Sequence, residues 1–428
     1  MVRRVILRVC WLVGRMLDDR SIDAALVDPC TYADEARYHG LFGHLRRADP
    51  VHWAQPEGHR PFWTLSKHAD IVEVARQNRL FLSGGAGNLL SAAETRAIGA
   101  IPGFFSYERS ILMMDEPEHR TYRHLTQSWF TPGNMARLKA DITRLAHAAV
   151  DGMAEFGGAC DFVNDVAAAF PLRVIMRIFG LPPEDDPYVR DLTRRIFAAS
   201  DADYGAGSET GPGTRLTRNM TDYFASITSE RRRRPGDDLA SLIANARIDG
   251  APIGDIEAAA HYLLILTAGH YTTTAALTGG LLALLRNPAE MQKLRGHDAL
   301  LPGAVREMIR FVTPITHMFR VAGEQYELRG RHMRPGDPVM LCFPSANRDE
   351  DVFADPSAFR IDRPGAPHVA FGYGAHVCLG QHLTTLEMQI FFAVLLGRVK
   401  QMELAAEPAY TRSTFVSGLK RLPIRFQM

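Results

Sequence analysis

Apolar residues recur at every third or fourth position through most of this chain, with polar residues between them. This spacing gives an α-helix one apolar face, so it is typical of helices that pack against a core. The segments with this pattern are residues 133–156, 167–179, 187–200, 214–233, 253–286, 288–295 and 301–311. The periodicity predicts a mainly α-helical protein.

Strand-like segments are few, and they lie towards the two ends of the chain. They are VHWAQ and PFWTLS near the N-terminus, then HMFRVA, YELRG, PVMLCF and the last ~15 residues. No internal repeat or low-complexity linker divides the sequence. We therefore expect one continuous architecture with a minor β region. Residues 81–110 are glycine-rich and weakly patterned, which predicts a long loop.

The longest uncharged segment spans residues 258–285 and contains no Asp, Glu, Lys or Arg. Runs of this length can form a transmembrane helix, but this one contains His261, His270, Tyr271 and a cluster of threonines. We expect instead a long helix through the middle of a globular protein. At about 1.5 Å per residue, such a helix would cross a whole domain.

Composition narrows the possible functions. The chain has 428 residues, 46% of them hydrophobic. Its net charge is only +1, whereas a protein that binds nucleic acid needs an excess of basic residues. The basic run RRRR at residues 231–234 precedes PGDDL, which is typical of a solvated helix end. Nucleic acid is therefore not an expected partner.

The five cysteines are scattered along the chain and form no C-x-x-C pair. This pattern argues against a disulfide framework and against a structural zinc site. It fits a protein of the reducing cytoplasm, which is the location we expect.

The first residues, MVRRVILRVCWLVGRML, resemble a signal peptide. Arg8 and Arg15 interrupt the apolar run, however, and no small-residue cleavage site follows. We expect residues 1–25 to be an N-terminal extension of uncertain role, without membrane association. A start codon placed too far upstream and attachment to a membrane surface remain alternatives.

One cysteine lies in a segment that indicates chemistry, FGYGAHVCLGQHL at residues 371–383. Gly372, Gly374 and Gly380 flank Cys378, and glycine allows positive φ and close approach to a flat ligand. The helical pattern resumes directly after Cys378, so the thiol lies where amide N–H groups and the helix dipole favour a thiolate. Such a thiolate is a suitable axial ligand for haem iron. The alternative is an inert buried cysteine beside a glycine turn.

The segment from Phe371 to Gly380 resembles the haem-binding loop of the cytochrome P450 haem-thiolate monooxygenases of the soluble bacterial class. The resemblance implies the cytochrome P450 fold, with a long central helix over the haem, and haem b (iron protoporphyrin IX) as cofactor. It also implies that residues 26–428 form a single cytochrome P450 domain without a fused reductase. Other motifs occur in the order of this family, so the resemblance extends over nearly the whole chain.

The other motifs contain charged and histidine residues. In EMIR, Glu307 and Arg310 lie three apart on a predicted helix, and in the family such a pair belongs to a buried structural network behind the haem. Four further side chains match the family's contacts to the haem propionates, where N–H donors form charge-assisted hydrogen bonds. They are His119 and Arg123 in EPEHRTYRHL, Arg320 in HMFRVA, and His376.

The family also suggests a role for AGHYTTT, at the centre of the long helix. Ala268 and Thr272 lie on one helix face, and the Thr272 hydroxyl can bond the carbonyl four residues back, which opens a small groove. Gly269 removes side-chain bulk beside it. Dioxygen would lie in this groove, and Thr272 would guide a proton to its outer oxygen.

Two positions depart from the family pattern. An Asp or Glu usually precedes the threonine, but here the residue is Tyr271, whose phenol has a reference pKa near 10 against about 4 for a carboxyl. Water, Thr273 or a substrate hydroxyl would replace the acid, or the chemistry would be peroxide-driven, or Tyr271 would point away as packing. After the cysteine loop, Thr384 and Thr385 stand where the family often has Ala-Arg, which removes one basic residue near the haem.

The sequence therefore predicts a haem-thiolate monooxygenase that inserts one oxygen atom from O₂ into a small or medium apolar substrate. That substrate would be a terpenoid, an aromatic compound or a natural-product intermediate. Electrons would come from a separate ferredoxin and its ferredoxin reductase, and the protein would be a monomer. A peroxide-driven enzyme and a non-catalytic haem protein that binds a ligand are the alternatives.

The substrate pocket should be mostly aliphatic and aromatic. The loop around residues 89–105 is expected to contribute, together with Ala268 and Thr272. The further candidates are Leu264, Ile315, Met318, Phe415 and Val416.

Overall fold

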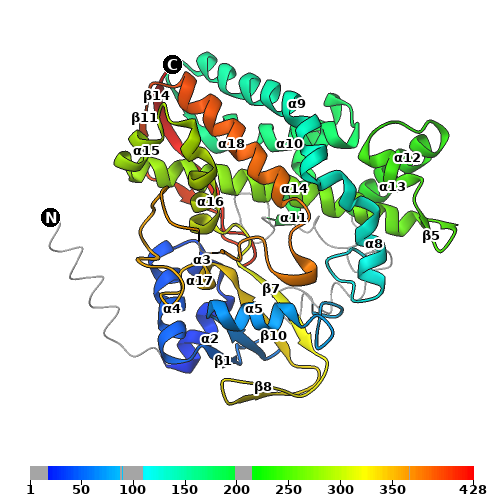
Figure 1. Ribbon diagram of the computed structural model, residues 1–428, viewed down its shortest axis with the longest axis vertical. Helices are drawn as coiled ribbons and strands as arrows, with labels where there is room; N and C mark the ends of the chain where they lie inside the picture. The colour runs from blue at the N-terminus through cyan, green and yellow to red at the C-terminus, as the bar shows by residue number, and fades with distance from the viewer. Residues whose placement is uncertain (1–17, 87–88, 90–108, 198–214, 366) are drawn as a thin grey trace.

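The computed structural model describes residues 18–86, 89, 109–197, 215–365 and 367–428 (Figure 1). Most of the expected N-terminal extension and of the expected substrate loop therefore lies outside the described residues. None of the helices in the described part of the chain has the length and apolarity needed to span a lipid bilayer.

The described chain is mainly helical, which confirms the prediction from periodicity (Figure 1). The α-helices are α2 (Asp19–Val27), α3 (Pro29–Tyr32), α4 (Glu35–Ala48), α5 (His68–Arg76), α8 (Glu118–Gln127), α9 (Pro132–Asp151), α10 (Ala169–Phe179), α11 (Asp186–Phe197), α12 (Arg215–Arg233), α13 (Leu239–Ala244), α14 (Asp255–Arg286), α15 (Pro288–Leu294), α16 (Leu301–Val312), α17 (Phe343–Ala346) and α18 (Gln381–Arg398).

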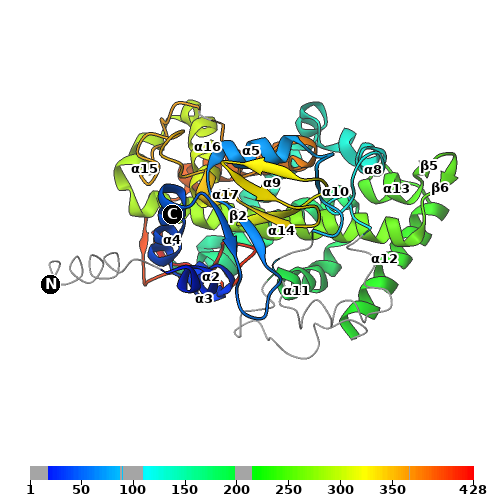
Figure 2. The ribbon, with the colours of Figure 1, turned by 90° about the horizontal axis from the view of Figure 1, so that it is seen from below.

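The largest sheet joins strands from both ends of the chain in the order β1-β2-β10-β7-β3. Its strands are β1 (Val51–Ala54), β2 (Phe62–Leu65), β3 (Phe81–Leu82), β7 (His317–Ala322) and β10 (Pro338–Cys342). Neighbouring strands are antiparallel except β2 and β10, which pair in parallel. Figure 2 shows this sheet in front of α14, with α2, α3 and α4 at one end. The predicted strand segments VHWAQ, PFWTLS, HMFRVA and PVMLCF are thus partners in one sheet, whereas YELRG and the last residues contribute to other sheets.

Smaller sheets complete the β region. They are β11 (Gln401–Leu404), β14 (Pro423–Gln427) and β4 (Ala159–Asp161) in one three-stranded sheet, and the pairs β5 (Arg247–Ile248) with β6 (Ala251–Pro252), β8 (Tyr326–Leu328) with β9 (Arg331–Met333), and β12 (Ala409–Tyr410) with β13 (Leu419–Arg421).

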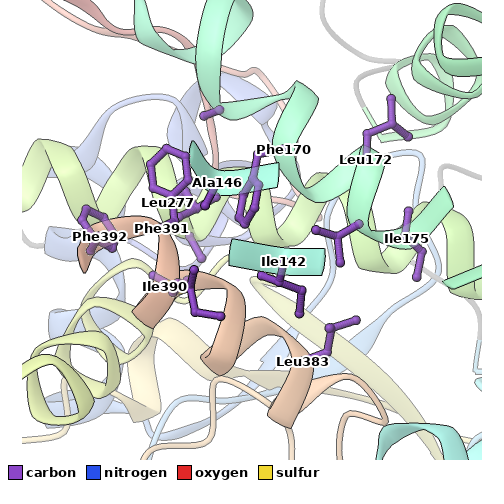
Figure 3. Close-up of a cluster of buried hydrophobic side chains, with 14 of the residues drawn as sticks. Ile142, Ala146, Phe170, Leu172, Ile175, Leu277, Leu383, Ile390, Phe391 and Phe392 are labelled. Atoms are coloured by element: carbon purple, nitrogen blue, oxygen red, sulfur yellow. The ribbon is translucent and has the colours of Figure 1, made fainter. Parts of the chain in front are cut away.

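Helix α14 is the uncharged segment identified from the sequence, extended by charged residues at each end. Asp255 and Glu257 lie in its first turn and Arg286 in its last, so these charges complement the helix dipole. It contacts α10, α11, α12, α16 and α18, which explains why its sides are apolar almost all round. Figure 3 shows part of the surrounding core, in which Leu277 of α14 lies near Phe170 of α10 and Phe391 of α18.

The structure differs from the predicted elements at three boundaries. The helix predicted at 133–156 is α-helical only to Asp151 and continues as a 3₁₀ helix, Gly152–Phe156. A π-helical segment, Phe162–Ala167, precedes α10. The segment predicted as a loop at 81–110 begins with β3, because its first two residues pair with β7, and such long-range pairing leaves no local signal.

Candidate active site

A cavity of about 310 Å³ lies between α14, strand β7 and the loop that precedes α18. It brings together residues that are far apart in the sequence. The predicted site residues that line it are Arg123, Leu264, Ala268, Gly269, Thr272, Ile315, Met318, Arg320, Phe371, Gly372, His376, Cys378, Gly380 and Phe415. Most of its other lining residues are apolar, among them Ile111, Leu112 and Leu263.

The loop around Cys378 is closed by backbone hydrogen bonds, with the Cys378 N–H donating to the Phe371 carbonyl at 2.8 Å. Gly372 and Gly374 have φ angles of 72° and 74°, as the glycine pattern predicts. A Cβ at Gly374 would also collide with the Ala75 carbonyl oxygen. Gly380 does not have a positive φ: its φ is −86°, at the N-cap of α18.

The Cys378 thiol is exposed to the cavity, at the junction of loop and helix. Burial within the surrounding protein raises its pKa, whereas the charge of Arg123 and backbone hydrogen bonds from Gly380 and Gln381 act in the opposite direction. The predicted contacts that favour a thiolate are therefore present, but in the free thiol burial has the larger effect on the pKa. A bound metal ion deprotonates a coordinating thiol outright.

Basic and histidine side chains gather beside Cys378. The ring centroids of His119 and His376 are 4.0 Å apart. Both ring nitrogens of His119 are buried without a hydrogen-bond partner, and Nε2 of His376 lies 3.0 Å from Oγ of Ser83. Arg320 is 7% exposed, and Nη2 of Arg123 donates to the Val377 carbonyl at 2.7 Å. The four predicted propionate contacts thus surround one corner of the site.

This group of side chains has many donors and few acceptors. Burial lowers the pKa of Arg320 to about 10, and burial followed by the charges of Arg320, His119 and Arg123 lowers the pKa of His376. Two carboxylates placed here would accept a hydrogen bond from an unpartnered ring nitrogen of His119 and offset the positive charge of the arginines. The residues therefore fit a flat macrocycle that has carboxylates at one edge and a metal above a thiol.

The centre of α14 lies over the cavity as predicted. Oγ1 of Thr272 donates to the Ala268 carbonyl at 2.6 Å. Gly269 lines the cavity, and a Cβ there would lie 3.2 Å from Cδ1 of Ile175 on α10, so the small residue also permits close helix packing.

Tyr271 is directed elsewhere. Its hydroxyl lies 3.3 Å from Oγ1 of Thr411, and its side chain lines a second cavity of about 40 Å³ on another side of α14, together with Arg190 and Asn164. It is not among the residues that line the main cavity. Of the three interpretations made from the sequence, this geometry favours packing away from the groove.

Glu307 and Arg310 form the buried ion pair that EMIR predicts. Nε and Nη2 of Arg310 donate to the two carboxylate oxygens at 2.7 and 2.8 Å, and both side chains are 2% exposed. The pair has a third member that the sequence did not predict, Arg363, whose Nε lies 3.1 Å from each Glu307 oxygen. Arg363 lies in an irregular segment, so no periodicity marks it as a partner.

The predicted substrate residues do not all reach the cavity. Leu264, Ile315, Met318 and Phe415 line it. Val416 does not: it is fully buried and forms an isolated β-bridge with Ile315. Adjacent residues in an extended segment point to opposite sides, so Phe415 and Val416 cannot both face the cavity.

Comparison with known proteins, like the geometry of the site, indicates a haem protein. The cytochrome P450 family model matches residues 216–408. Cytochrome P450-terp of a Pseudomonas species is 38% identical over 95% of this chain and 97% of its own length. Linalool 8-monooxygenase of Pseudomonas putida is 31% identical over 93% of this chain and 98% of its own length.

Two solved structures are also similar. CYP108D1 from Novosphingobium aromaticivorans has a TM-score of 0.88 and 38% identity, and covers 96% of this chain and 99% of its own. Mycobacterium marinum CYP268A2, in complex with pseudoionone, has a TM-score of 0.85 and 31% identity, and covers 93% of this chain and 97% of its own.

Fold and site together define a haem-dependent oxidoreductase. The chain belongs to the cytochrome P450 family. It is a cytochrome P450 monooxygenase, and its cofactor is haem, iron protoporphyrin IX.

Proposed function

We propose that this enzyme inserts one oxygen atom from O₂ into a C–H or C=C bond of a small or medium terpenoid. The observation that carries the proposal is the apolar lining of the cavity above Cys378, where Thr267 and Thr272 are the main polar side chains on α14. Both hydroxyls already donate to carbonyls of their own helix, to Leu263 at 2.7 Å and to Ala268 at 2.6 Å. The name of one relative, linalool 8-monooxygenase, supports this substrate class, as does the pseudoionone bound in the structure of another.

The proposed roles of the residues follow from their positions. Cys378 would hold the haem iron through its sulfur, and the bound haem would supply the redox chemistry. Phe371, Gly372 and Gly374 would shape the loop that faces the haem, and Gly380 would border the haem from the N-cap of α18.

Four side chains at one corner of the cavity would hold the haem propionates by hydrogen bonds. They are His119, Arg123, Arg320 and His376. Ala268, Gly269 and Thr272 form the groove in which O₂ is placed.

Electrons are proposed to come from a separate ferredoxin, reduced by its own reductase. Exposed basic side chains near the cysteine loop support docking of an acidic partner there. One is Arg76, which donates to the Tyr373 hydroxyl at 2.9 Å, and another is Arg120 of α8, which is 72% exposed.

We further propose that residues 26–428 act as one domain, as a monomer, and in the cytoplasm. The contacts of α14 with helices from residues 169 to 398 support the single domain. The described cysteines are all free, which supports a reducing compartment.

The first test is the absorption spectrum of the reduced protein with carbon monoxide. A strongly red-shifted Soret band in the wild type, lost in Cys378→Ser, is the expected result. Linalool should then shift the iron spin state, and NADH with ferredoxin and its reductase should give oxidised product. A Soret band at the position of histidine-ligated haem would contradict thiolate ligation. Product formed with hydrogen peroxide but not with ferredoxin would favour the peroxide-driven alternative, which the absence of an acid at Tyr271 keeps open.

A further inference from the structure

Thr267 of α14 lines the main cavity five residues before Thr272. Its Oγ1 donates to the Leu263 carbonyl at 2.7 Å and also lies 3.3 Å from the Leu264 carbonyl. A hydroxyl has a single proton and two lone pairs, so both contacts use the proton of Thr267. What the oxygen still offers to a ligand is therefore a hydrogen-bond acceptor and not a donor.

The described wall around Thr267 is otherwise apolar. The neighbouring residues of α14 that line the same cavity are Ala260, Leu263 and Leu264. Among the described lining residues, the other polar side chains belong to Thr272, to the cysteine loop, to α18 and to the corner that contains Arg123 and Arg320. A ligand beside Thr267 thus meets an apolar surface that carries a hydrogen-bond acceptor.

Thr267 and Thr272 are far enough apart to contact two ends of one small molecule. Five residues of an α-helix rise about 7.5 Å along its axis, which is comparable to the extended carbon chain of a monoterpene. Thr272 lies at the groove with Ala268, where O₂ is proposed to be placed. A molecule bound by one end at Thr267 can therefore present its other end to the groove.

We propose that the substrate is a terpenoid alcohol whose hydroxyl donates a hydrogen bond to Oγ1 of Thr267. The proposal rests on the proposed monooxygenase function and narrows its substrate class. Because the hydroxyl holds one end of the molecule, oxygen is inserted at a carbon of the opposite end. The C–H bond there becomes C–OH, and the second atom of O₂ leaves as water with two electrons from ferredoxin and two protons from solvent.

The same contact selects against a ketone or an aldehyde. A carbonyl oxygen has lone pairs and no proton, so it cannot bond to an oxygen whose own proton is already used by the helix. Thr267 is thus a specificity-determining residue, because it distinguishes an alcohol from a carbonyl compound with the same carbon skeleton.

Two matched pairs of compounds test the alcohol. Citronellene has the carbon skeleton of linalool without the hydroxyl, and sulcatone is the ketone of the alcohol sulcatol. Dissociation constants for the oxidised holoenzyme are measured by spectral titration and equilibrium dialysis, which need neither electrons nor ferredoxin. The decisive quantity is the ratio of constants within each pair, compared between the wild type and the variants, because this comparison cancels differences in solubility.

The variants separate the hydroxyl from the volume of the side chain. Thr267→Val keeps the volume and removes the hydroxyl, whereas Thr267→Ser keeps the hydroxyl. Thr278→Val is the matched control, because Oγ1 of Thr278 donates to the Thr274 carbonyl at 2.9 Å and lies 3.2 Å from the Ala275 carbonyl. Thr278 thus has the same bonding pattern on the same helix, but it is not among the residues that line the main cavity.

Thr267→Val should weaken the binding of linalool and sulcatol by about 3- to 10-fold and should not weaken that of citronellene or sulcatone. Thr267→Ser and Thr278→Val should keep the wild-type ratios. With NADH, ferredoxin and its reductase, the wild type should oxidise linalool at the end remote from the hydroxyl. Thr267→Val should spread the oxidation over more positions.

Equal changes for linalool and citronellene in Thr267→Val, or no change for either, overturn the Thr267 contact. Tighter binding of sulcatone than of sulcatol by the wild type overturns the alcohol and leaves terpenoid oxidation in place. If none of the four compounds binds to the wild type, the proposed substrate class fails, and the Thr267 contact fails with it.

Discussion

The surroundings of Tyr271 decide whether its hydroxyl can take part in catalysis. Its hydroxyl is close to Thr411, which follows β12, and its ring borders the small cavity that also contains Arg190 and Asn164. A side chain directed there cannot exchange protons with the groove at Thr272. Its contribution should therefore be to packing.

Tyr271→Phe tests this assignment. The change removes only the hydroxyl, so product per NADH should remain within about twofold of the wild type, far from the loss caused by removing a proton donor. The thermal midpoint of unfolding should fall slightly, since one hydrogen bond of about 1 kcal/mol is lost. A large fall in product per NADH would instead show that the Tyr271 hydroxyl takes part in supplying protons to the groove at Thr272.

Glu387 makes a pH-dependent contribution to stability. Its pKa is raised in the folded state, so above the ordinary value of 4.5 the folded protein keeps a proton that the unfolded chain loses. The free energy of unfolding therefore falls as pH rises from that value towards the folded pKa.

Glu387→Gln should remove this dependence. Relative to the wild type, the variant should gain stability with rising pH, by up to about 1.4 kcal/mol per pH unit above the unfolded pKa. Urea unfolding across the acidic to neutral range measures the difference. A constant difference between the two proteins would show that the carboxyl is already ionised in the folded state.

At the scale of elements, α16 is joined to the segment before the cysteine loop by charged side chains. Glu307 of α16 binds Arg310 of the same helix and Arg363, and Nη1 of Arg310 donates to the Asn347 carbonyl at 2.7 Å. All three charged side chains are at most 8% exposed. The network fixes the chain on its approach to Cys378.

Arg363→Ala should leave the Glu307 carboxylate with one of its two arginine partners, at a cost of about 3–5 kcal/mol. Urea unfolding and haem retention on a desalting column measure the effect. Arg360→Ala is the control, because Arg360 is 48% exposed and its pair with Asp362 at 3.4 Å is a surface contact. Equal losses in the two variants would contradict a structural role for the network.

The elements also show what the sequence could and could not predict. The long helices follow from periodicity, since each has one face on a common core, and α14 could be located from its missing charges. The cysteine loop could be predicted because glycine and thiol chemistry are local. The pairing of β2 with β10, the partner of Glu307 and the direction of Tyr271 depend on contacts between distant segments, which leave no periodic signal.

At the scale of the whole molecule, the cysteine loop lies against α5 and α8 near the surface. Arg76 of α5 donates to the Tyr373 hydroxyl, and Arg123 of α8 donates to the Val377 carbonyl. Exposed basic side chains on these helices would meet an acidic ferredoxin at the point nearest Cys378.

If the proposed ferredoxin docks here, Arg120→Glu should raise its KM several-fold, because like charges would then oppose docking, and should leave the reduced carbon monoxide spectrum unchanged. High ionic strength should reduce the difference from the wild type. Arg233→Glu on α12 is the control, since its exposed charge is on another helix. An identical KM in Arg120→Glu would place the ferredoxin elsewhere.

The parallel pairing of β2 with β10 has a consequence for synthesis of the protein. Strand β2 leaves the ribosome with its edge towards β10 unpaired, and β10 follows only after α14 and α16 have been made. At about 5–20 residues per second, that interval lasts tens of seconds. The nascent chain therefore carries an open strand edge during this interval, and slow translation should increase its aggregation.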